Sequence, residues 1–442
     1  MFQADTSGIK VFSFWIRPGL VRKNVLAVLF ASFITISLTV FMSLIQPYVL
    51  NEIVLIPQER QGTVTGVLTL LQELVTILLV GFMGAWSDRV GRRHVYVLGF
   101  CVLGLSYFVY PFADSVNDLV LFRSIFAVGI AMTPVMLSAT VQDTPQEISR
   151  ARWIGMNNVL QGLGVVLIAT VLLGNAPKWF SAAGYSPMNA GRYAFWMAAG
   201  LCVLAALVLR GGLPQGASYD SGTDSIWRKF SAGVAEGLRN PRLAVAYGSA
   251  FIGRGDLVIV GNFLTLWVVQ QGIANGMSTA AAAGRGAMFF GLVQVSALCF
   301  AFLMGIIADK LNRVTGLCFA LALATVGYSL MGQVDDPFGP LMIPVCIVLG
   351  MGEVSIIVSG GALLGQEAAP RKRGAIIGVF NLMGAIGIMV AGFAGGKVFD
   401  MIGPTAPFAM MGILNGVLFV LALICRMRAG IPEQQHQPDT TN

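Results

Sequence analysis

The sequence predicts an all-α integral membrane protein with twelve transmembrane helices in two pseudo-symmetric halves of six. Three observations carry this prediction. Hydrophobic residues make up 56% of the 442 positions and charged residues only 11%, whereas a soluble domain carries roughly a quarter charged residues. The apolar residues fall into twelve runs, each close to the about 20 residues that one crossing needs. Two short patterns in the first half of the chain recur in the second half.

The twelve apolar runs are expected to be helices, because a backbone in lipid must satisfy its hydrogen bonds within its own segment. The expected spans are 24–48, 62–86, 94–112, 117–140, 153–174, 191–210, 243–270, 286–308, 314–331, 338–364, 374–398 and 405–425. The six cysteines lie inside apolar runs, where free Cys behaves as a small hydrophobe. Their positions indicate neither a disulfide framework nor a metal site.

The distribution of Lys and Arg predicts the orientation in the membrane. Most of the 28 basic residues lie before the first span, in alternate connections and after the last span. Because cytoplasmic loops carry the excess of Lys and Arg, we expect a bacterial inner (plasma) membrane protein with both termini in the cytoplasm. The net charge of +7 then follows from topology, and no nucleic-acid partner is expected.

This topology divides the chain into five parts. They are a cytoplasmic tail at 1–23, a six-helix half at 24–210, a cytoplasmic linker at 211–242, a second six-helix half at 243–428, and a cytoplasmic tail at 429–442. The first tail shows no cleavable signal peptide, and its aromatic and basic residues predict a short amphipathic piece at the membrane interface.

Two internal repeats indicate a duplication. Residues 84–93 follow the second span and residues 305–313 follow the eighth, about half the chain later. A second echo, at nearly the same offset, pairs 154–158 with 377–381. Internal repeats are typical of secondary transporters, which place the substrate site at the repeat interface near the midplane.

The repeated loop resembles the cytoplasmic signature loop of the major facilitator superfamily, in which a Gly is followed by an acidic residue and by basic residues around a second Gly. The first copy supplies Gly84, Asp88, Arg89, Gly91, Arg92 and Arg93. The second copy supplies Gly305, Asp309, Lys310 and Arg313, with Asn312 in place of the second Gly. The resemblance covers nearly the whole chain and implies the fold of that superfamily. The subfamily is not identified, since the fifth span lacks the Gly-Pro-rich signature of drug–proton antiporters.

The resemblance also implies a cytoplasmic gate that forms when that side is shut. The expected contacts are Asp88 with the start of the eleventh span near Gly374, Arg89 or Arg92 with Asp143, Asp309 with the start of the fifth span near Trp153, and Arg313 near Glu367; Arg152 lies in the same set. A carboxylate at a helix N-terminus accepts free N–H groups and meets the positive end of the dipole. In the alternative interpretation, these residues only anchor the orientation.

Five ionisable residues lie inside spans, where each costs about 3 kcal/mol unless it is paired or faces water. They are Glu73, Arg123, Arg254, Asp256 and Glu353. The three acids are candidate proton carriers, and Arg123 resembles the fourth-helix arginine that is linked to proton coupling in the superfamily. Arg254 could instead bind an anionic solute or pair with Glu73 or Glu353. A static ion pair between helices is the alternative for each residue.

Polar and aromatic residues of the spans give possible substrate contacts: Gln46, Asn157, Asn158, Asn262, Trp267 and Asn381. Helix–helix hydrogen bonding is their alternative role. The function predicted is secondary active transport of a small organic solute by alternating access, coupled to protons, in a monomer within the lipid bilayer. Export of drugs, lipids or other amphiphiles and gradient-driven uniport are alternatives, as are a channel and a membrane receptor. With two histidines and no phosphate-binding loop, the sequence favours neither an enzyme nor a cofactor.

Overall fold

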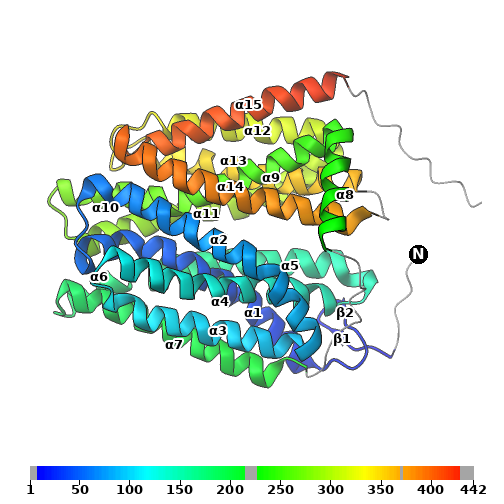
Figure 1. The fold of residues 1–442 in the computed structure, drawn as a ribbon, viewed down its shortest axis with the longest axis horizontal. Coiled ribbons are helices and arrows are strands. Elements are labelled where there is room, and N and C mark those ends of the chain that lie inside the picture. The colour runs from blue at the N-terminus through cyan, green and yellow to red at the C-terminus, as the bar shows by residue number, and fades with distance from the viewer. Residues whose placement is uncertain (1–6, 215–225, 369–371, 429–442) are drawn as a thin grey trace, which may run out of the picture.

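The computed structural model describes residues 7–214, 226–368 and 372–428, without the side chains of 226–230, 232 and 309. Within these residues, twelve helical segments are long and apolar enough to cross a membrane. They lie side by side in one bundle (Figure 1). The predicted all-α class and the number of spans are therefore confirmed.

The first six spans form the N-terminal half. The first four spans are α1 (Arg22–Tyr48) with η1 (Val49–Ile53), α2 (Gln58–Val90), α3 (Arg92–Val109) with η2 (Tyr110–Phe112), and α4 (Val116–Asp143). The fifth span is interrupted and consists of η3 (Glu147–Ser149), α5 (Arg150–Gly164), η4 (Val165–Leu173) and α6 (Ala176–Ala182). The sixth span is α7 (Pro187–Gly212). The fifth span is thus longer than the predicted 153–174.

The last six spans form the C-terminal half. They comprise α9 (Pro241–Ile259), η5 (Val260–Leu264) and α10 (Thr265–Ala274) as one span, then α11 (Thr279–Lys310), α12 (Arg313–Met331), α13 (Met342–Glu367), α14 (Arg373–Met401) and α15 (Ala406–Arg428). Three segments, η1, η4 and η5, are π-helical. Such segments occur often at functional sites.

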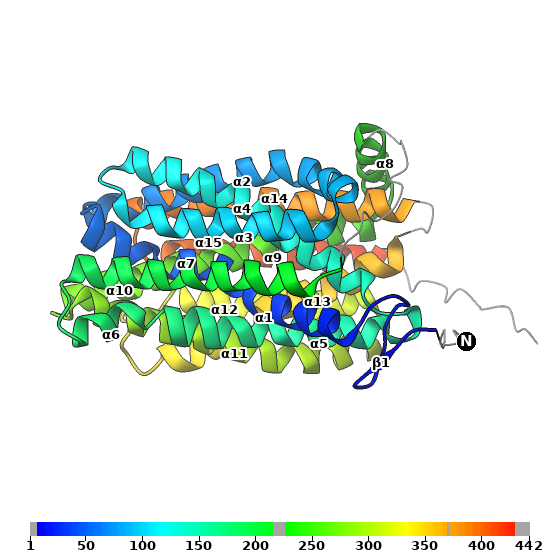
Figure 2. The same ribbon diagram turned by 90° about the horizontal axis from the view of Figure 1, so that it is seen from below.

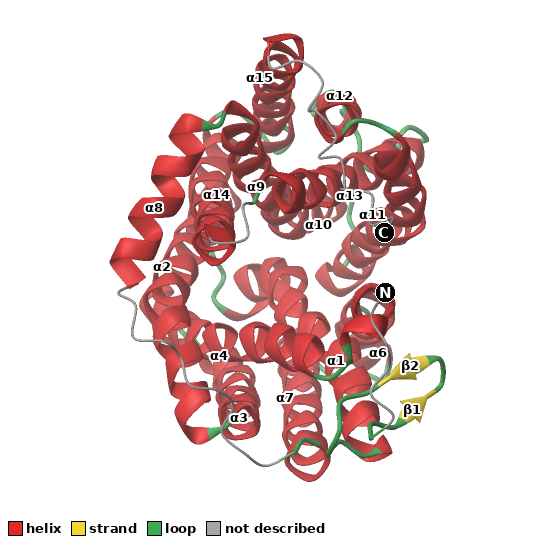
Figure 3. Cartoon of the chain, turned by 90° about the vertical axis from the view of Figure 1, so that its right-hand side faces the viewer, coloured by secondary structure: helices red, strands yellow, loops and turns green. Residues whose placement is uncertain are grey.

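The two halves occupy opposite sides of the bundle. Seen along the helices, α1, α3, α4 and α7 gather on one side and α9, α12, α13 and α15 on the other (Figure 3). We call the end that carries 84–93, 305–313 and α8 (Ile226–Arg239) the basic end, which is at the right of Figure 1, and the other the opposite end. The view from below shows the spans running the full length between these ends (Figure 2).

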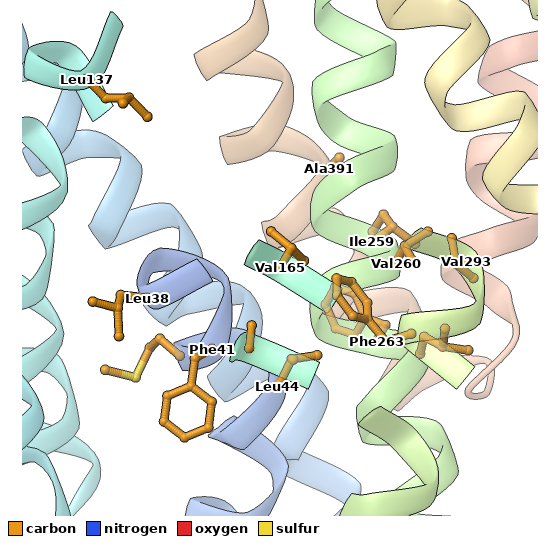
Figure 4. Packing of buried hydrophobic residues seen from close by; sticks show 14 of the residues in the cluster. Leu38, Phe41, Leu44, Leu137, Val165, Ile259, Val260, Phe263, Val293 and Ala391 are labelled. Atoms are coloured by element: carbon orange, nitrogen blue, oxygen red, sulfur yellow. The ribbon is translucent and has the colours of Figure 1, made fainter. Parts of the chain in front are cut away.

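The buried apolar side chains are continuous between the halves. Figure 4 shows Leu44 of α1 and Val165 of η4 in the same cluster as Val260 and Phe263 of η5. Contacts of α1 with η5 and of η4 with α11 connect the two halves directly. Each dispersion contact between packed apolar atoms is weak, but many such contacts together are strongly attractive. This packing therefore holds the two halves together.

The central linker contains a helix that the sequence analysis did not predict. The backbone of α8 packs against α9 and α14, and the Tyr247 hydroxyl donates to the Gly233 carbonyl oxygen at 3.1 Å. Glu236 forms an ion pair with Lys372 at 2.6 Å. The hydrogen bond that Lys372 donates to the Glu236 carboxylate, together with the positive charge of Lys372, holds the pKa of the Glu236 carboxyl below its usual range. The described part of the linker is therefore attached to the C-terminal half.

The described part of the N-terminal tail packs on the protein, and its placement at the membrane interface stays a prediction. It forms a hairpin of β1 (Lys10–Val11) and β2 (Phe14–Trp15) that lies on the connection between α4 and α5. Trp15 N donates to Ser149 Oγ at 2.9 Å, and the Phe14 ring packs edge-on against the Trp153 ring at 5.5 Å. Phe14 and Trp15 are half-buried, whereas Phe12 is 72% exposed.

Candidate transport site

Three charged side chains come together near the middle of the bundle. Glu73 lies halfway along α2 and Arg123 lies in α4, while Arg254 lies in α9 of the other half. Glu73 and Arg123 are 6% and 3% exposed, whereas Arg254 is exposed. The Glu73 carboxylate interacts electrostatically with both guanidinium groups. The site therefore combines charges of opposite sign from both halves.

Arg254 packs against a glycine on α14. A methyl group added to Gly384 would lie 2.8 Å from Arg254 Cγ, so a side chain at this position would have to displace the arginine stem. Of the two carboxylates expected as possible partners, Glu73 is the one that interacts with Arg254. An arginine near the midplane is tolerated when it faces water or a carboxylate, and Arg254 interacts with the Glu73 carboxylate.

Arg123 is surrounded by aromatic and amide side chains. Its guanidinium lies 5.3 Å from the centre of the Phe126 ring and interacts with the Tyr110 hydroxyl, which in turn donates to Gln46 Oε1 at 3.0 Å. Within the described residues, Arg123 Nε and Nη1 and Gln46 Nε2 have no hydrogen-bond partner. Unused buried donors are costly, so these groups are available to bind an acceptor.

The other two acids lie apart from this group, inside the C-terminal half. Asp256 is fully buried in α9 and accepts hydrogen bonds from Asn415 Nδ2 of α15 at 3.1 and 3.2 Å. Glu353 of α13 is 2% exposed and contacts Gln294 of α11. Arg254 and Asp256 thus face different neighbours, which agrees with their separation by two positions on one helix.

The halves are closed against each other at the opposite end. A side chain on Gly62 would meet the Gly396 carbonyl oxygen at 2.8 Å, and one on Gly66 would meet the Gly392 carbonyl oxygen at 2.8 Å, so α2 and α14 touch through their backbones. Asp400 at the end of α14 accepts hydrogen bonds from Gly62 N at 2.9 Å and from Thr63 N at 2.6 Å. This carboxylate therefore connects the two halves near the start of α2.

At the basic end the first signature loop makes contacts within its own half. Arg92 pairs with Asp143, which is one of the two pairings expected, and Asp88 interacts with Arg92. Around Gly84 and Gly374 no described atom lies within 4 Å of an added side-chain carbon. Both glycines therefore lie in open surroundings, and the contact of Asp88 with the start of α14 stays a prediction.

The second signature loop is arranged differently. Glu367 pairs with Arg242 at 3.7 Å and accepts a hydrogen bond from Asn240 Nδ2 at 2.8 Å, a pairing that the sequence analysis did not predict. Arg313, which was expected near Glu367, donates to the Ala308 carbonyl oxygen at 2.7 Å. The side chain of Asp309 lies outside the described residues.

Most of the predicted substrate contacts are engaged inside the protein. Asn157 accepts from Ser32 Oγ at 2.6 Å and donates to the Trp153 carbonyl oxygen at 2.8 Å. Asn262 Nδ2 donates to Thr69 Oγ1 at 2.9 Å across the interface between the halves. Trp267 is 1% exposed. Burial and hydrogen bonding of this kind are what the alternative role in helix packing predicts, and contact of these residues with a solute stays a prediction.

Two predicted contacts are accessible. Asn158 is exposed and lines a pocket of about 190 Å³ between α1, α4 and α5, together with Ser138, Gln142 and Gln161. Asn381 is exposed on α14, one turn before Gly384. The two asparagines occupy corresponding positions of the repeat, so they are the residues best placed to contact a solute from either half.

Several residues of the site were missed from the sequence. Asp400 and Arg242 each lie at a span end, where acidic and basic residues are common and carry no signal of a partner. Tyr328 and Asn415 lie inside apolar runs and look like ordinary polar residues of a span. Gly396 did carry a signal, since a run of glycines in α14 indicates close helix packing.

Comparison with known proteins identifies the family. The sequence profile of the Major Facilitator Superfamily matches residues 25–354 and 286–441, which together cover nearly the whole chain. The chain belongs to the Major Facilitator Superfamily. As a member it is a membrane transporter and not an enzyme, and the resemblance of residues 84–93 to the signature loop is confirmed at the level of the family.

Individual members of the superfamily resemble the chain over most of its length. Magnetosome protein MamH of Paramagnetospirillum magneticum is 28% identical over 403 residues, which are 87% of this chain and 89% of that protein. Magnetosome protein MamZ of the same organism is also 28% identical, over 83% of this chain, which spans 57% of MamZ. The crystal structure of the nucleoside transporter NupG matches with a TM-score of 0.70 at 15% identity, over 92% of this chain and 98% of that one. This last likeness concerns the fold alone.

Proposed function

We propose that this transporter moves a small organic solute by alternating access, driven by a proton gradient, with Glu73 as the group that binds the proton. The supporting observation is that the Glu73 carboxylate interacts electrostatically with Arg123 of its own half and with Arg254 of the other half. A carboxylate buried near the midplane is expensive to keep, and one that interacts across the interface of the halves takes part in any movement between them.

Alternating access gives this arrangement a coupling mechanism. When the halves rock against each other, Glu73 and Arg123 move together, whereas the separation of Glu73 and Arg254 changes. A nearby guanidinium favours the charged carboxylate, and its withdrawal favours proton binding. The protonation state of Glu73 is thus linked to the conformation of the transporter. Coupling of transport to a proton gradient requires such a link.

We further propose that the basic end is cytoplasmic and that its signature loops form the inner gate. The distribution of Lys and Arg supports this orientation in a bacterial inner membrane. In the arrangement described, Asp400 and the glycines of α2 and α14 close the opposite end. Closure of the basic end would bring Asp88 to the start of α14, where the helix dipole favours a carboxylate.

Uptake assays in proteoliposomes test the proposal. A panel of labelled organic solutes is offered with and without an imposed pH gradient, and accumulation that needs the gradient identifies the solute. With that solute, Glu73→Gln should lose gradient-driven accumulation but keep exchange of labelled for unlabelled solute. Glu59→Gln removes an exposed acid from the same helix and should retain both activities. Full accumulation by Glu73→Gln would contradict the role of Glu73, and a panel in which only amphiphiles are moved would favour the exporter.

A further inference from the structure

Four polar side chains meet in the interior of the C-terminal half. They are Asp256 of α9, Tyr328 of α12, Glu353 of α13 and Asn415 of α15, and each is at most 2% exposed. The four helices pack against one another in the pairs α12–α13, α12–α15, α9–α13 and α9–α15. The cluster therefore lies within one half, and the movement between halves does not take it apart.

The cluster is incompletely hydrogen-bonded. Asn415 Nδ2 donates to both oxygens of Asp256 and, at 3.0 Å, to the Met411 carbonyl oxygen. Three oxygen atoms from three helices remain without a hydrogen-bond partner in the part of the chain that the structure describes: Asn415 Oδ1, Tyr328 Oη and Glu353 Oε2. Buried polar atoms are satisfied in the great majority of cases, so three such atoms at one place indicate a missing ligand.

In the described part of the chain, no basic side chain forms an ion pair with this cluster. Glu353 acts on Asp256 by electrostatic repulsion. The Tyr328 hydroxyl lies near both carboxylates and interacts with Asp256, although it does not meet the geometry of a hydrogen bond. Arg254 is two residues from Asp256 in sequence, yet the carboxylate that attracts it is Glu73. Two carboxylates in an apolar interior are highly unfavourable without a partner of opposite charge.

We propose that this cluster is a binding site for a hard divalent cation, held by the carboxylates of Asp256 and Glu353 with neutral oxygens from Asn415 and Tyr328. Two carboxylates carry two negative charges, which one divalent ion balances. Carboxylate and carbonyl oxygens are the ligands preferred by Mg²⁺, Ca²⁺ and Mn²⁺. The three unpartnered oxygens and the two charges are then satisfied by a single ligand.

Gln294 of α11 is half-buried and contacts the Glu353 carboxylate. From the sequence alone, Asp256 and Glu353 are expected to be proton carriers and no metal ion is expected. Within the described residues no cluster of three or more His, Cys, Asp or Glu could hold a metal, and the proposed site is recognisable only because neutral oxygens complete it.

Equilibrium binding of Mn²⁺ to the purified full-length protein in detergent tests the site. No gradient or solute is present, so the result is independent of the proposed transport function. Electron paramagnetic resonance of free Mn²⁺ should show one saturable ion per chain, displaced by Mg²⁺ or Ca²⁺. Asp256→Asn and Glu353→Gln should each weaken binding at least tenfold, because each removes a charged ligand.

Two further variants keep the test decisive. Tyr328→Phe retains the ring and removes one oxygen, so it should fold and weaken Mn²⁺ binding several-fold. Glu59→Gln removes an acid far from the cluster and should bind Mn²⁺ as the unchanged chain does. The proposal is overturned if the unchanged chain binds no stoichiometric Mn²⁺, or if monodisperse Asp256→Asn, Glu353→Gln and Tyr328→Phe proteins bind it with unaltered affinity.

Discussion

Asp400 holds the opposite end of the transporter closed, and its removal should shift the conformational equilibrium. The carboxylate accepts hydrogen bonds from Gly62 N at 2.9 Å and Thr63 N at 2.6 Å, across the boundary between the halves. A hydrogen bond to a charged group contributes about 1.5–3 kcal/mol when it is fully buried. Asp400 is half-buried and water replaces part of the loss, so we expect Asp400→Ala to cost about 1–2 kcal/mol in total. That free energy changes the ratio of closed to open states about 5- to 30-fold.

A cysteine at position 170 reports on this opening. Thr170 of η4 is 4% exposed and lies against Gly291 of α11, so Thr170→Cys becomes accessible when the opposite end opens. In a background without the native cysteines, Asp400→Ala should raise its labelling rate by an impermeant maleimide about 5- to 30-fold. Asp400→Asn keeps an acceptor oxygen and should raise it less.

Asp336 provides the matched control for this experiment. It lies in the connection between α12 and α13 at the same end, and its side chain accepts a hydrogen bond from Phe338 N in its own turn. Asp336→Ala changes the charge of that end equally and should leave the labelling of Thr170→Cys unchanged. Equal labelling rates in the Asp400→Ala and Asp336→Ala proteins would refute the reasoning.

Three further predictions concern the gate, the packing and the topology. Asp88→Asn should leave membrane insertion intact and reduce transport in proteoliposomes, because the closed inner gate loses a charged acceptor; normal transport would exclude that role. Gly396→Ala should lower the melting temperature in detergent, since its methyl group overlaps the backbone of α2 and overpacking costs about 1–3 kcal/mol. Gly361→Ala enters open space and is the control, whose equal melting loss would contradict the packing argument. Impermeant reagents should label Asn189→Cys but not Ser225→Cys from outside intact cells, and the reverse pattern would invert the topology.

The candidate site was only partly predictable. Counting residues along α2 and α9 places Glu73 and Arg254 near the midplane, because a helix rises about 1.5 Å per residue. Which carboxylate faces Arg254 depends on the rotation of each helix and on the room left by Gly384, neither of which is visible in a single sequence. For the same reason Asn157 and Asn158, adjacent in sequence, have different roles: one is fully buried and the other lines a pocket.

The sequence by itself determined that the protein lies in a lipid bilayer and how many spans it has. It also determined the repeat of short patterns between the two halves and the family signature at 84–93. These features depend on composition, local periodicity and short patterns, which are properties of contiguous residues. The tertiary structure alone decided that Asp400 accepts hydrogen bonds from the start of α2, that Glu367 pairs with Arg242, and that Asp256 and Glu353 lie near Tyr328. Each of these pairs residues from different helices, and their meeting is set by helix packing over distances in sequence that no local pattern records.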